Sequence, residues 1–156
     1  MSKSLKRVKS ALTEAGLTAD VLEMDGSTRT AAEAAAQAGC VIDQIAKSII
    51  FKGEDSGEAL LFITAGGNQV DADKASALAG EALGKADAAL IRAQTGFAIG
   101  GVAPVGHVNP IRAWFDPRLS AFEVVFAAAG TPRHIVPMTP EDILRLSGAL
   151  PADFTV

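Results

Sequence analysis

The sequence predicts an α/β or α+β domain with a mixed β-sheet. Segments rich in β-branched and aromatic residues alternate with segments of helical periodicity, and β-rich segments occur in both halves of the chain. No internal repeat or long linker interrupts the 156 residues. A chain of this length can bury a substantial core as one unit, so we expect a single domain over residues 1–156.

The N-terminal segment predicts an amphipathic helix over Ser4–Ala15 that ends at Gly16. Its apolar residues recur at helical spacing without a continuous run, so we expect neither an export signal nor a membrane span. The segment also carries a basic cluster. We interpret this cluster as a solvated helix face, although contact with one end of an RNA stays open: Lys3, Lys6, Arg7 and Lys9.

A short strand and a capped helix follow in the sequence. The segment Val21–Met24 alternates weakly and predicts a strand. Thr30 and Glu33 form a capping box, in which the hydroxyl accepts from an early helical N–H and the glutamate reaches back. The Ala-rich helix that they begin ends at Gly39.

A β-hairpin and two helices are predicted in the middle of the chain. Ser48–Phe51 and Ala59–Thr64 are apolar runs on either side of a turn rich in glycine, aspartate and serine. Asp71 can cap a helix over Ala72–Ala79. A second helix is expected over Ala86–Gln94.

Three strands and a final helix are predicted in the C-terminal third. The strands are IRAWF, FEVVFAAAG and HIVPM, and DPRLS forms a turn after the first of them. The helix lies in TPEDILRLSG, with Thr139 at the N-cap, Pro140 at the first helical position and acids in the first turn.

Composition limits the classes of function. With 49% hydrophobic and 21% charged residues, the chain is typical of a globular protein. Cys40 is the only cysteine, which excludes an internal disulfide and fits a reducing compartment, so we expect a cytoplasmic protein. The net charge of −4 argues against a broad nucleic-acid surface.

The segment TGFAIGGVAPVGH, Thr95–His107, has an unusually bare backbone. Gly101 and Gly106 have the spacing of a phosphate-binding P-loop, but His107 and Val108 follow where lysine and serine or threonine are required. The Rossmann fingerprint and the G-x-S-x-G elbow are absent from the sequence. The two histidines form no H-x-x-x-H pair, so we expect neither a metal nor a cofactor. Backbone groups and the substrate must therefore supply much of any catalysis.

Lys47 begins the apolar run KSIIF, where a lysine is unfavourable unless its ammonium reaches water or a partner. Two interpretations stay open from composition alone: a strand-end lysine that extends to solvent, or a ligand-binding cation. We interpret Lys52, at the other end of the run, as a solvated hairpin residue.

In their order, five segments resemble the YbaK/ProX family of aminoacyl-tRNA editing domains, which is related to the insertion domain of bacterial prolyl-tRNA synthetases. The resemblance covers nearly the whole chain, and the segments that carry it are AKSIIFK, ALLFITAGGNQVDADKASALAG, TGFAIGGVAPVGH, WFDPRLSAFEVVFAAAG and TPEDILRLSGA. The pattern T-G-F-x-x-G-G-V-[SA]-P-x-G is quite specific, whereas KS before an apolar strand is specific only in this company. The resemblance implies a mixed sheet or partly open barrel surrounded by helices.

The same resemblance implies hydrolysis, in trans, of the ester that joins a wrong amino acid to a tRNA, most often a prolyl tRNA. It gives Lys47 the role of holding the aminoacyl end of the substrate. Gly100 and Gly101 match a glycine pair whose backbone approaches the substrate carbonyl. Pro104 and Gly106 shape the same substrate-binding loop.

The chemistry of deacylation agrees with these assignments. Negative charge develops on the ester oxygen, and each prepositioned N–H donor is worth about 3–4 kcal/mol in studied cases. Glycine permits the close approach and the backbone dihedrals that such a site requires. Because no strong general base is evident, a ribose hydroxyl of the substrate is our hypothesis for positioning the attacking water.

Five further residues have two interpretations each. By the resemblance His134 could enter the substrate cleft, although a structural role is favoured. Asp116 is expected to make an Asx-type turn before the following proline, with a pocket role as the alternative. We interpret His107 as a loop-packing residue in preference to a functional one, and Phe97 as a core anchor in preference to a residue that stacks on a base. Cys40 is expected to be a small buried apolar residue and not a nucleophile.

The leading hypothesis is a trans-editing aminoacyl-tRNA deacylase that contacts the acceptor end of tRNA, with prolyl-tRNA synthetase as a possible partner. One alternative is a non-catalytic module that binds an aminoacyl-like or nucleotide-like ligand, and another is a general esterase or thioesterase. The acyl group is not determined by the sequence, because small side-chain differences give modest discrimination. Cysteine, alanine, serine and threonine all stay open.

Overall fold

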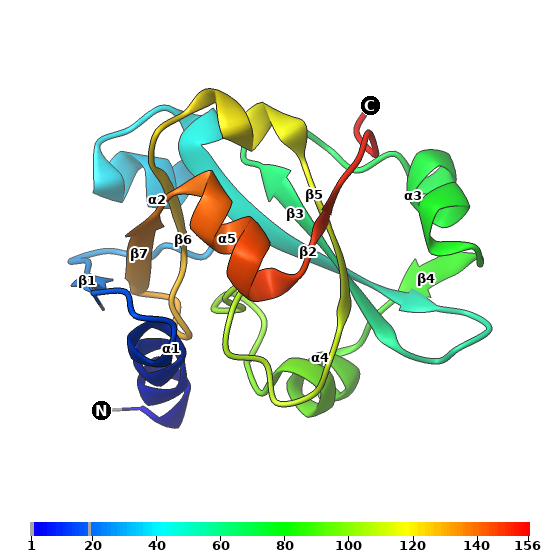
Figure 1. The fold of residues 1–156 in the computed structure, drawn as a ribbon, viewed down its shortest axis with the longest axis horizontal. Helices are drawn as coiled ribbons and strands as arrows, with labels where there is room; N and C mark the ends of the chain where they lie inside the picture. Colours follow the sequence, from blue (N-terminus) through cyan, green and yellow to red (C-terminus); the bar gives the residue numbers. More distant parts are fainter. Residues whose placement is uncertain (1, 19) are drawn as a thin grey trace.

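The computed structural model describes residues 2–18 and 20–156 (Figure 1). The α-helices in these ranges are α1 (Lys3–Glu14), α2 (Ala31–Ala38), α3 (Ala72–Ala79), α4 (Ala88–Thr95) and α5 (Pro140–Ser147). The strands are β1 (Leu22–Glu23), β2 (Ile45–Gly53), β3 (Ala59–Ala65), β4 (Leu83–Lys85), β5 (Arg112–Phe115), β6 (Val125–Ala128), β7 (His134–Met138) and β8 (Leu150–Pro151). Two 3₁₀ turns, Ile42–Gln44 and Pro117–Ala121, precede β2 and follow β5.

The strands form one mixed sheet in the order β1-β7-β6-β2-β3-β5-β8, with β4 paired to β2. Antiparallel pairing joins β2 to β3 and β6 to β7, whereas β3 with β5 and β2 with β6 run parallel. The path begins at β1 and ends at β8, so among the described residues the sheet does not close. The predicted mixed α/β fold is confirmed.

One edge of β2 is open over a short stretch. On that side β6 pairs only with Ile45 and Ala46, and β4 pairs only from Phe51 onward. The carbonyl of Ile63 accepts from the Asp116 N–H on the β5 side of β3. Because main-chain groups alternate in direction along a strand, Ser48, which is opposite Ile63, turns its N–H and C=O away from β3. The N–H and C=O of Ser48 and, two residues on, the N–H of Ile50 therefore face the gap between β6 and β4.

Side chains pack on both faces of the sheet. One cluster includes Phe97, Phe115 and Val8, all fully buried, and so connects the segment after α4 and helix α1 to the sheet. A second cluster lies on the other face, where the rings of Phe62 and Trp114 stack with centroids 4.9 Å apart. Burial of each such side chain contributes about 1.5–3 kcal/mol.

Most helices begin and end within two residues of the bounds that the local sequence signals predicted. Asp71 and Thr139 accept N–H groups of α3 and α5, as expected. Helix α4 begins at Ala88 because Asp87 is its cap. The α2 capping box is only half formed, since the Glu33 carboxylate accepts from the Thr30 hydroxyl. The short strands β4 and β8 were not predicted.

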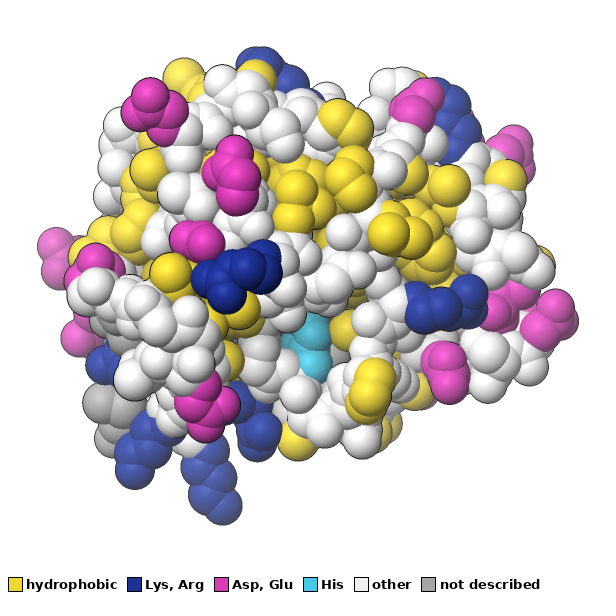
Figure 2. All heavy atoms as spheres, viewed as in Figure 1, with side chains coloured by type: hydrophobic (Ala, Val, Ile, Leu, Met, Phe, Trp, Pro, Cys, Tyr) yellow, Lys and Arg dark blue, Asp and Glu magenta, His cyan; other side chains and the backbone are white. Residues whose placement is uncertain are grey.

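The surface is unevenly charged. Figure 2 shows several Lys and Arg side chains that project at the lower left of the view, where α1 lies, while apolar, acidic and further basic side chains are spread over the rest of this face. Three apolar residues of α1 face the core, namely Leu5, Val8 and Leu12. The predicted amphipathic character of this helix is thus confirmed.

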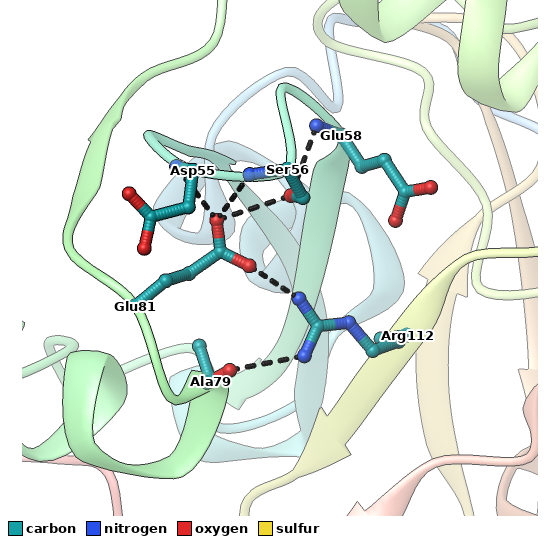
Figure 3. A network of polar contacts seen from close by, with 6 residues as sticks. All are labelled: Asp55, Ser56, Glu58, Ala79, Glu81 and Arg112. Carbon is teal, nitrogen blue, oxygen red and sulfur yellow. Dashed lines mark hydrogen bonds and ion pairs between the residues drawn. The ribbon is translucent and has the colours of Figure 1, made fainter.

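A carboxylate network fastens the β2–β3 turn to β4 and β5 (Figure 3). One oxygen of Glu81 accepts from the N–H groups of Asp55 and Ser56 and from the Ser56 hydroxyl. The other oxygen accepts from the Arg112 guanidinium at 2.7 Å. Arg112 also donates to the carbonyl of Ala79 at 3.0 Å, at the end of α3. The hydrogen bond from Ser56 N–H is the main reason that the pKa of Glu81 is lowered.

This lowered pKa predicts acid-sensitive stability. The ionised Glu81 stabilises the fold above the unfolded pKa of about 4.3, and this contribution is lost as the pH falls through the lower folded-state pKa. We expect Glu81→Gln to reduce the free energy of unfolding at pH 7, and the difference from wild type to shrink in more acidic solution. Urea unfolding at pH 7 and about pH 3 measures this.

Glu58→Gln is the matched control in the same turn, because the Glu58 side chain makes no hydrogen bond among the described residues. It should change the free energy of unfolding little at either pH. Equal losses in the two variants at pH 7 would contradict the role of Glu81.

Candidate functional site

The ammonium of Lys47 is held by the turn that follows β3. Its Nζ donates to the carbonyl of Asn68 at 2.6 Å and to that of Gly66 at 3.2 Å. Partial burial lowers the pKa of Lys47, and the charges of Asp116 and Asp43 oppose this effect. An ammonium has three N–H donors, so one is left for a ligand.

Two carboxylates position this turn. Asp116 is buried and accepts from Ala65 N–H at 3.1 Å and from the Asn68 side-chain amide at 2.9 Å. Asp43 accepts from Gly67 N–H at 2.9 Å. With the N–H groups of Ala65 and Gly67 bound by carboxylates, the turn directs two of its carbonyls to Lys47.

The Gly66–Gly67 pair is needed for this arrangement. A Cβ on Gly66 would lie 2.2 Å from the carbonyl oxygen of Ile42, and a Cβ on Gly67 would lie 2.3 Å from Asp43 Oδ1. Both distances are far below van der Waals contact. Sequence reasoning assigned no role to this pair, and the only local signal for one was the GGN tripeptide directly after a strand.

Lys47 lines a cavity of about 530 Å³ beside the open edge of β2. Pockets for small ligands have this size. Its walls are mainly apolar and come from α2, β2, α4, the glycine loop (residues 96–107), β6 and β7: Ala31, Ala34, Ile45, Ile49, Ile91, Ile99, Val102, Phe126 and Ile135. Its charged lining residues are Arg29 and Lys47, and in the described part of the chain no Asp, Glu, His or Cys lines it.

Backbone donors are the second chemical feature of the cavity. Gly100 lines it with φ +92°, a conformation that glycine adopts without strain. No hydrogen bond from the Gly100 N–H is found within residues 2–18 and 20–156. The main-chain N–H and C=O of Ser48 and the N–H of Ile50 lie on another wall, since both residues line the same cavity.

Two hydroxyl groups of lining residues have no partner in the described structure. They belong to Thr28 and Ser48, and both oxygens are buried. A buried polar atom without a hydrogen bond is unfavourable. The wall that contains them is therefore incompletely satisfied by the protein itself.

The other predicted residues of the glycine loop pack against the protein. Gly101 donates to the carbonyl of Ala98 at 3.1 Å, and a Cβ there would lie 2.8 Å from the Thr131 nitrogen. Pro104 is buried, and Gly106 has φ +77° with its Cβ position 3.2 Å from the Arg7 carbonyl oxygen. None of these three glycine-loop residues lines the cavity.

Neither histidine lines this cavity. His134 lines a second hollow of about 440 Å³ beside α1, and its Nδ1 hydrogen bonds with the Thr131 hydroxyl. His107 donates to the carbonyl of Ala103 at 2.7 Å, and burial lowers its pKa. Phe97 is fully buried and contacts His107 edge-on. The expected packing roles of Phe97 and His107 are confirmed.

Asp116 and Cys40 also lie outside the cavity lining. The expected Asx-type turn is confirmed, since Asp116 Oδ1 accepts from the N–H of Arg118. Asp116 therefore acts on the site through the turn that holds Lys47. Cys40 is only half-buried, and burial raises the pKa of its thiol.

Two wider observations concern the described residues alone. Nowhere in residues 2–18 and 20–156 do three or more His, Cys, Asp or Glu side chains gather as a metal site requires. Every helix in the same ranges is too short or too polar to cross a bilayer.

Comparison with known proteins agrees with the fold. The profile of the aminoacyl-tRNA editing domain family matches residues 25–146. The uncharacterized protein YwhH of Bacillus subtilis is 31% identical over 144 residues, which is 92% of this chain and 91% of that protein.

Solved structures extend this similarity. A crystal structure described as a candidate trans-editing enzyme for prolyl tRNA synthetase is 44% identical, with a TM-score of 0.91 over 100% of this chain and 99% of that one. The hypothetical protein APE2540 is 28% identical, with a TM-score of 0.87 over 96% of this chain and 99% of that one. The family match and these similar structures place the protein in the tRNA-editing class. The chain belongs to the aminoacyl-tRNA editing domain family.

Because Asp116 holds the turn that binds Lys47, we expect loss of its carboxylate to destabilise the protein. In Asp116→Asn, an amide NH₂, which is a donor, replaces one of the two acceptor oxygens. At least one of the N–H groups that now donate to the carboxylate is then left without an acceptor. We expect the free energy of unfolding to fall by about 1–3 kcal/mol, the usual penalty for buried unsatisfied groups. Urea unfolding measures it.

Asp153→Asn is the surface comparison, because Asp153 pairs with Lys74 where both side chains are exposed. This change should alter the free energy of unfolding by less than about 0.5 kcal/mol. A loss as small as this in Asp116→Asn would show that the carboxylate does not support the turn.

Proposed function

We propose that the protein hydrolyses the ester between a wrongly attached amino acid and tRNA, with a prolyl tRNA as the substrate. The supporting observation is a cavity that combines apolar walls, two cations and unpaired backbone donors, and whose described lining has no acid or histidine. Membership of the editing family gives the class of substrate. The prolyl tRNA is proposed from the similar structure described for prolyl tRNA synthetase.

In this proposal the terminal adenosine and its acyl group occupy the cavity. The Gly100 N–H donates to the ester carbonyl oxygen, where negative charge develops during attack. The free N–H of Lys47 holds the aminoacyl end by charge and hydrogen bonding. The open edge of β2 offers a further N–H and a carbonyl at Ser48, and the carbonyl can accept from an α-ammonium group.

The reaction needs only water and the substrate. A water oxygen attacks the acyl carbon, the bond from that carbon to the ribose oxygen breaks, and the water proton passes to the ribose oxygen. The products are the free amino acid and tRNA. Because no acid or histidine is found in the described lining, we assign the orientation of the water to the neighbouring ribose hydroxyl.

The deacylation assay uses tRNA for proline charged in turn with alanine, cysteine, serine, threonine and proline. We expect the wild type to release at least one non-cognate amino acid faster than proline. Lys47→Ala should lower kcat/KM about 100-fold, the size expected for loss of one preorganised donor. Lys52→Ala is the matched control, because Lys52 lies on the same strand but is exposed and outside the cavity.

Other outcomes separate the competing functions. A wild type that binds these tRNAs and releases no amino acid would support the non-catalytic binding module. Full activity in Lys47→Ala would refute the assigned role of the lysine. Addition of prolyl-tRNA synthetase to each reaction tests whether this enzyme assists.

A substrate change tests the source of the oriented water. With tRNA that ends in 2′-deoxyadenosine, acylated at the 3′ position, we expect the hydrolysis rate to fall at least about 100-fold, the lower end of general acid–base contributions. Binding should change much less, since one hydroxyl is lost. An unchanged rate on the deoxy substrate would mean that a protein group orients the water.

A further inference from the structure

Helix α1 carries its charges in the order that least favours a helix. Lys3, Lys6 and Arg7 fall within its first five residues, its first turn has no acid and its last turn has no base. Positive charge at a helix N-terminus opposes the helix dipole, and Lys3 and Arg7, four residues apart, repel each other. Helix α5 has the opposite and favourable order. The stability of α1 therefore does not explain its basic residues.

These cations are also unpaired. Lys3 and Lys6 are exposed and Arg7 and Lys9 are half-buried, and none of the four forms an ion pair among the described residues. Figure 2 shows basic side chains that project from the molecule over α1. Glu23 lines the second hollow together with Lys9, but no ion pair joins them. A compact positive surface is thus left on a protein of net charge −4.

Close contacts connect this surface to the cavity. The Cβ position of Gly106 lies 3.2 Å from the Arg7 carbonyl oxygen, which places α1 against the glycine loop. Gly100 lines the cavity, and its Cβ position lies 3.1 Å from the side chain of Arg29. Arg29 is exposed at the same cavity and has no ion pair within the described residues. Arg29 at the cavity and the basic helix α1 therefore both contact the glycine loop.

We propose that α1 binds the phosphates of the acceptor stem of a tRNA whose terminal nucleotide occupies the cavity. Arg29 contacts the phosphates between the two. The basic residues of this helix extend from Lys3 to Lys9, about 9 Å along its axis, which matches roughly two to three nucleotide steps of one strand at ~3.4 Å. This inference rests on the proposed function for the position of the terminal nucleotide.

The test compares two variants with the same change of charge. Lys3→Ala/Lys6→Ala removes two exposed lysines from α1, and Lys52→Ala/Lys85→Ala removes two exposed lysines from β2 and β4. Binding of uncharged tRNA for proline is measured by fluorescence anisotropy between about 0.05 and 0.3 M salt. The slope of the logarithm of affinity against the logarithm of salt concentration reports the number of phosphate contacts. Uncharged tRNA is used because its binding does not depend on hydrolysis.

For the α1 variant we expect the salt slope to fall by about 1.4–1.8 and the affinity at 0.1 M salt to fall about 25- to 60-fold, if binding at 1 M is equal. Its melting temperature should stay the same or rise, because repulsion in α1 is relieved. The control variant should bind as the wild type does. Hydrolysis of a short acylated 3′-terminal oligonucleotide should be equal in all three proteins.

Three results would overturn the inference: wild-type affinity in the α1 variant, equal losses in both variants, or a loss that is seen only with prolyl-tRNA synthetase present. The last would assign α1 to the synthetase. Failure of the proposed function is a separate result, because a wild type that hydrolyses no acylated substrate can still bind uncharged tRNA through α1.

Discussion

The candidate site depends on the pairing of one ammonium with two carbonyls. A lysine beside an apolar cavity is stable only if its charge is solvated by the protein, and here the turn after β3 provides that solvation. This turn depends on Asp43 and Asp116, whose carboxylates accept from the N–H groups of Gly67 and Ala65. The position of Lys47 is thus determined by residues that never reach the cavity.

This arrangement explains why the charge of Lys47 can be available to a ligand. Had a carboxylate paired directly with the lysine, its negative charge would have offset the positive charge of the ammonium. Carbonyl groups stabilise the ammonium without cancelling its charge. The negative charges of Asp116 and Asp43 favour the protonated form of Lys47 without a direct ion pair. A single free N–H with a full positive charge is the result.

The sequence predicted what is determined locally. Asp71 and Gly80 enclose α3 within a few residues of chain, and Thr139 with Pro140 does the same at the start of α5, so cap chemistry was sufficient. The strands β4 and β8 have two or three residues and exist only because β2 and β5 are beside them. No periodicity can be recognised in so short a segment.

The candidate site was predictable only in part, for the same reason. Lys47 and Gly100 could be selected from their segments, and both line the cavity. The need for Gly66 comes from the approach of Ile42, and the packing of Gly101 comes from Thr131. Such constraints arise between segments distant in sequence, so the residues alone gave no sign of which glycine in a pair lines the cavity and which packs against the protein.

The gap beside β2 also has a consequence for self-association. An exposed strand edge can pair with another chain and start aggregation. Here the unpaired stretch is only Lys47–Ile50, and β6 and β4 close it at each end. A foreign strand would need a longer row of free main-chain groups to pair with. The protein can therefore leave donors and acceptors open to a small ligand while it denies them to a second polypeptide.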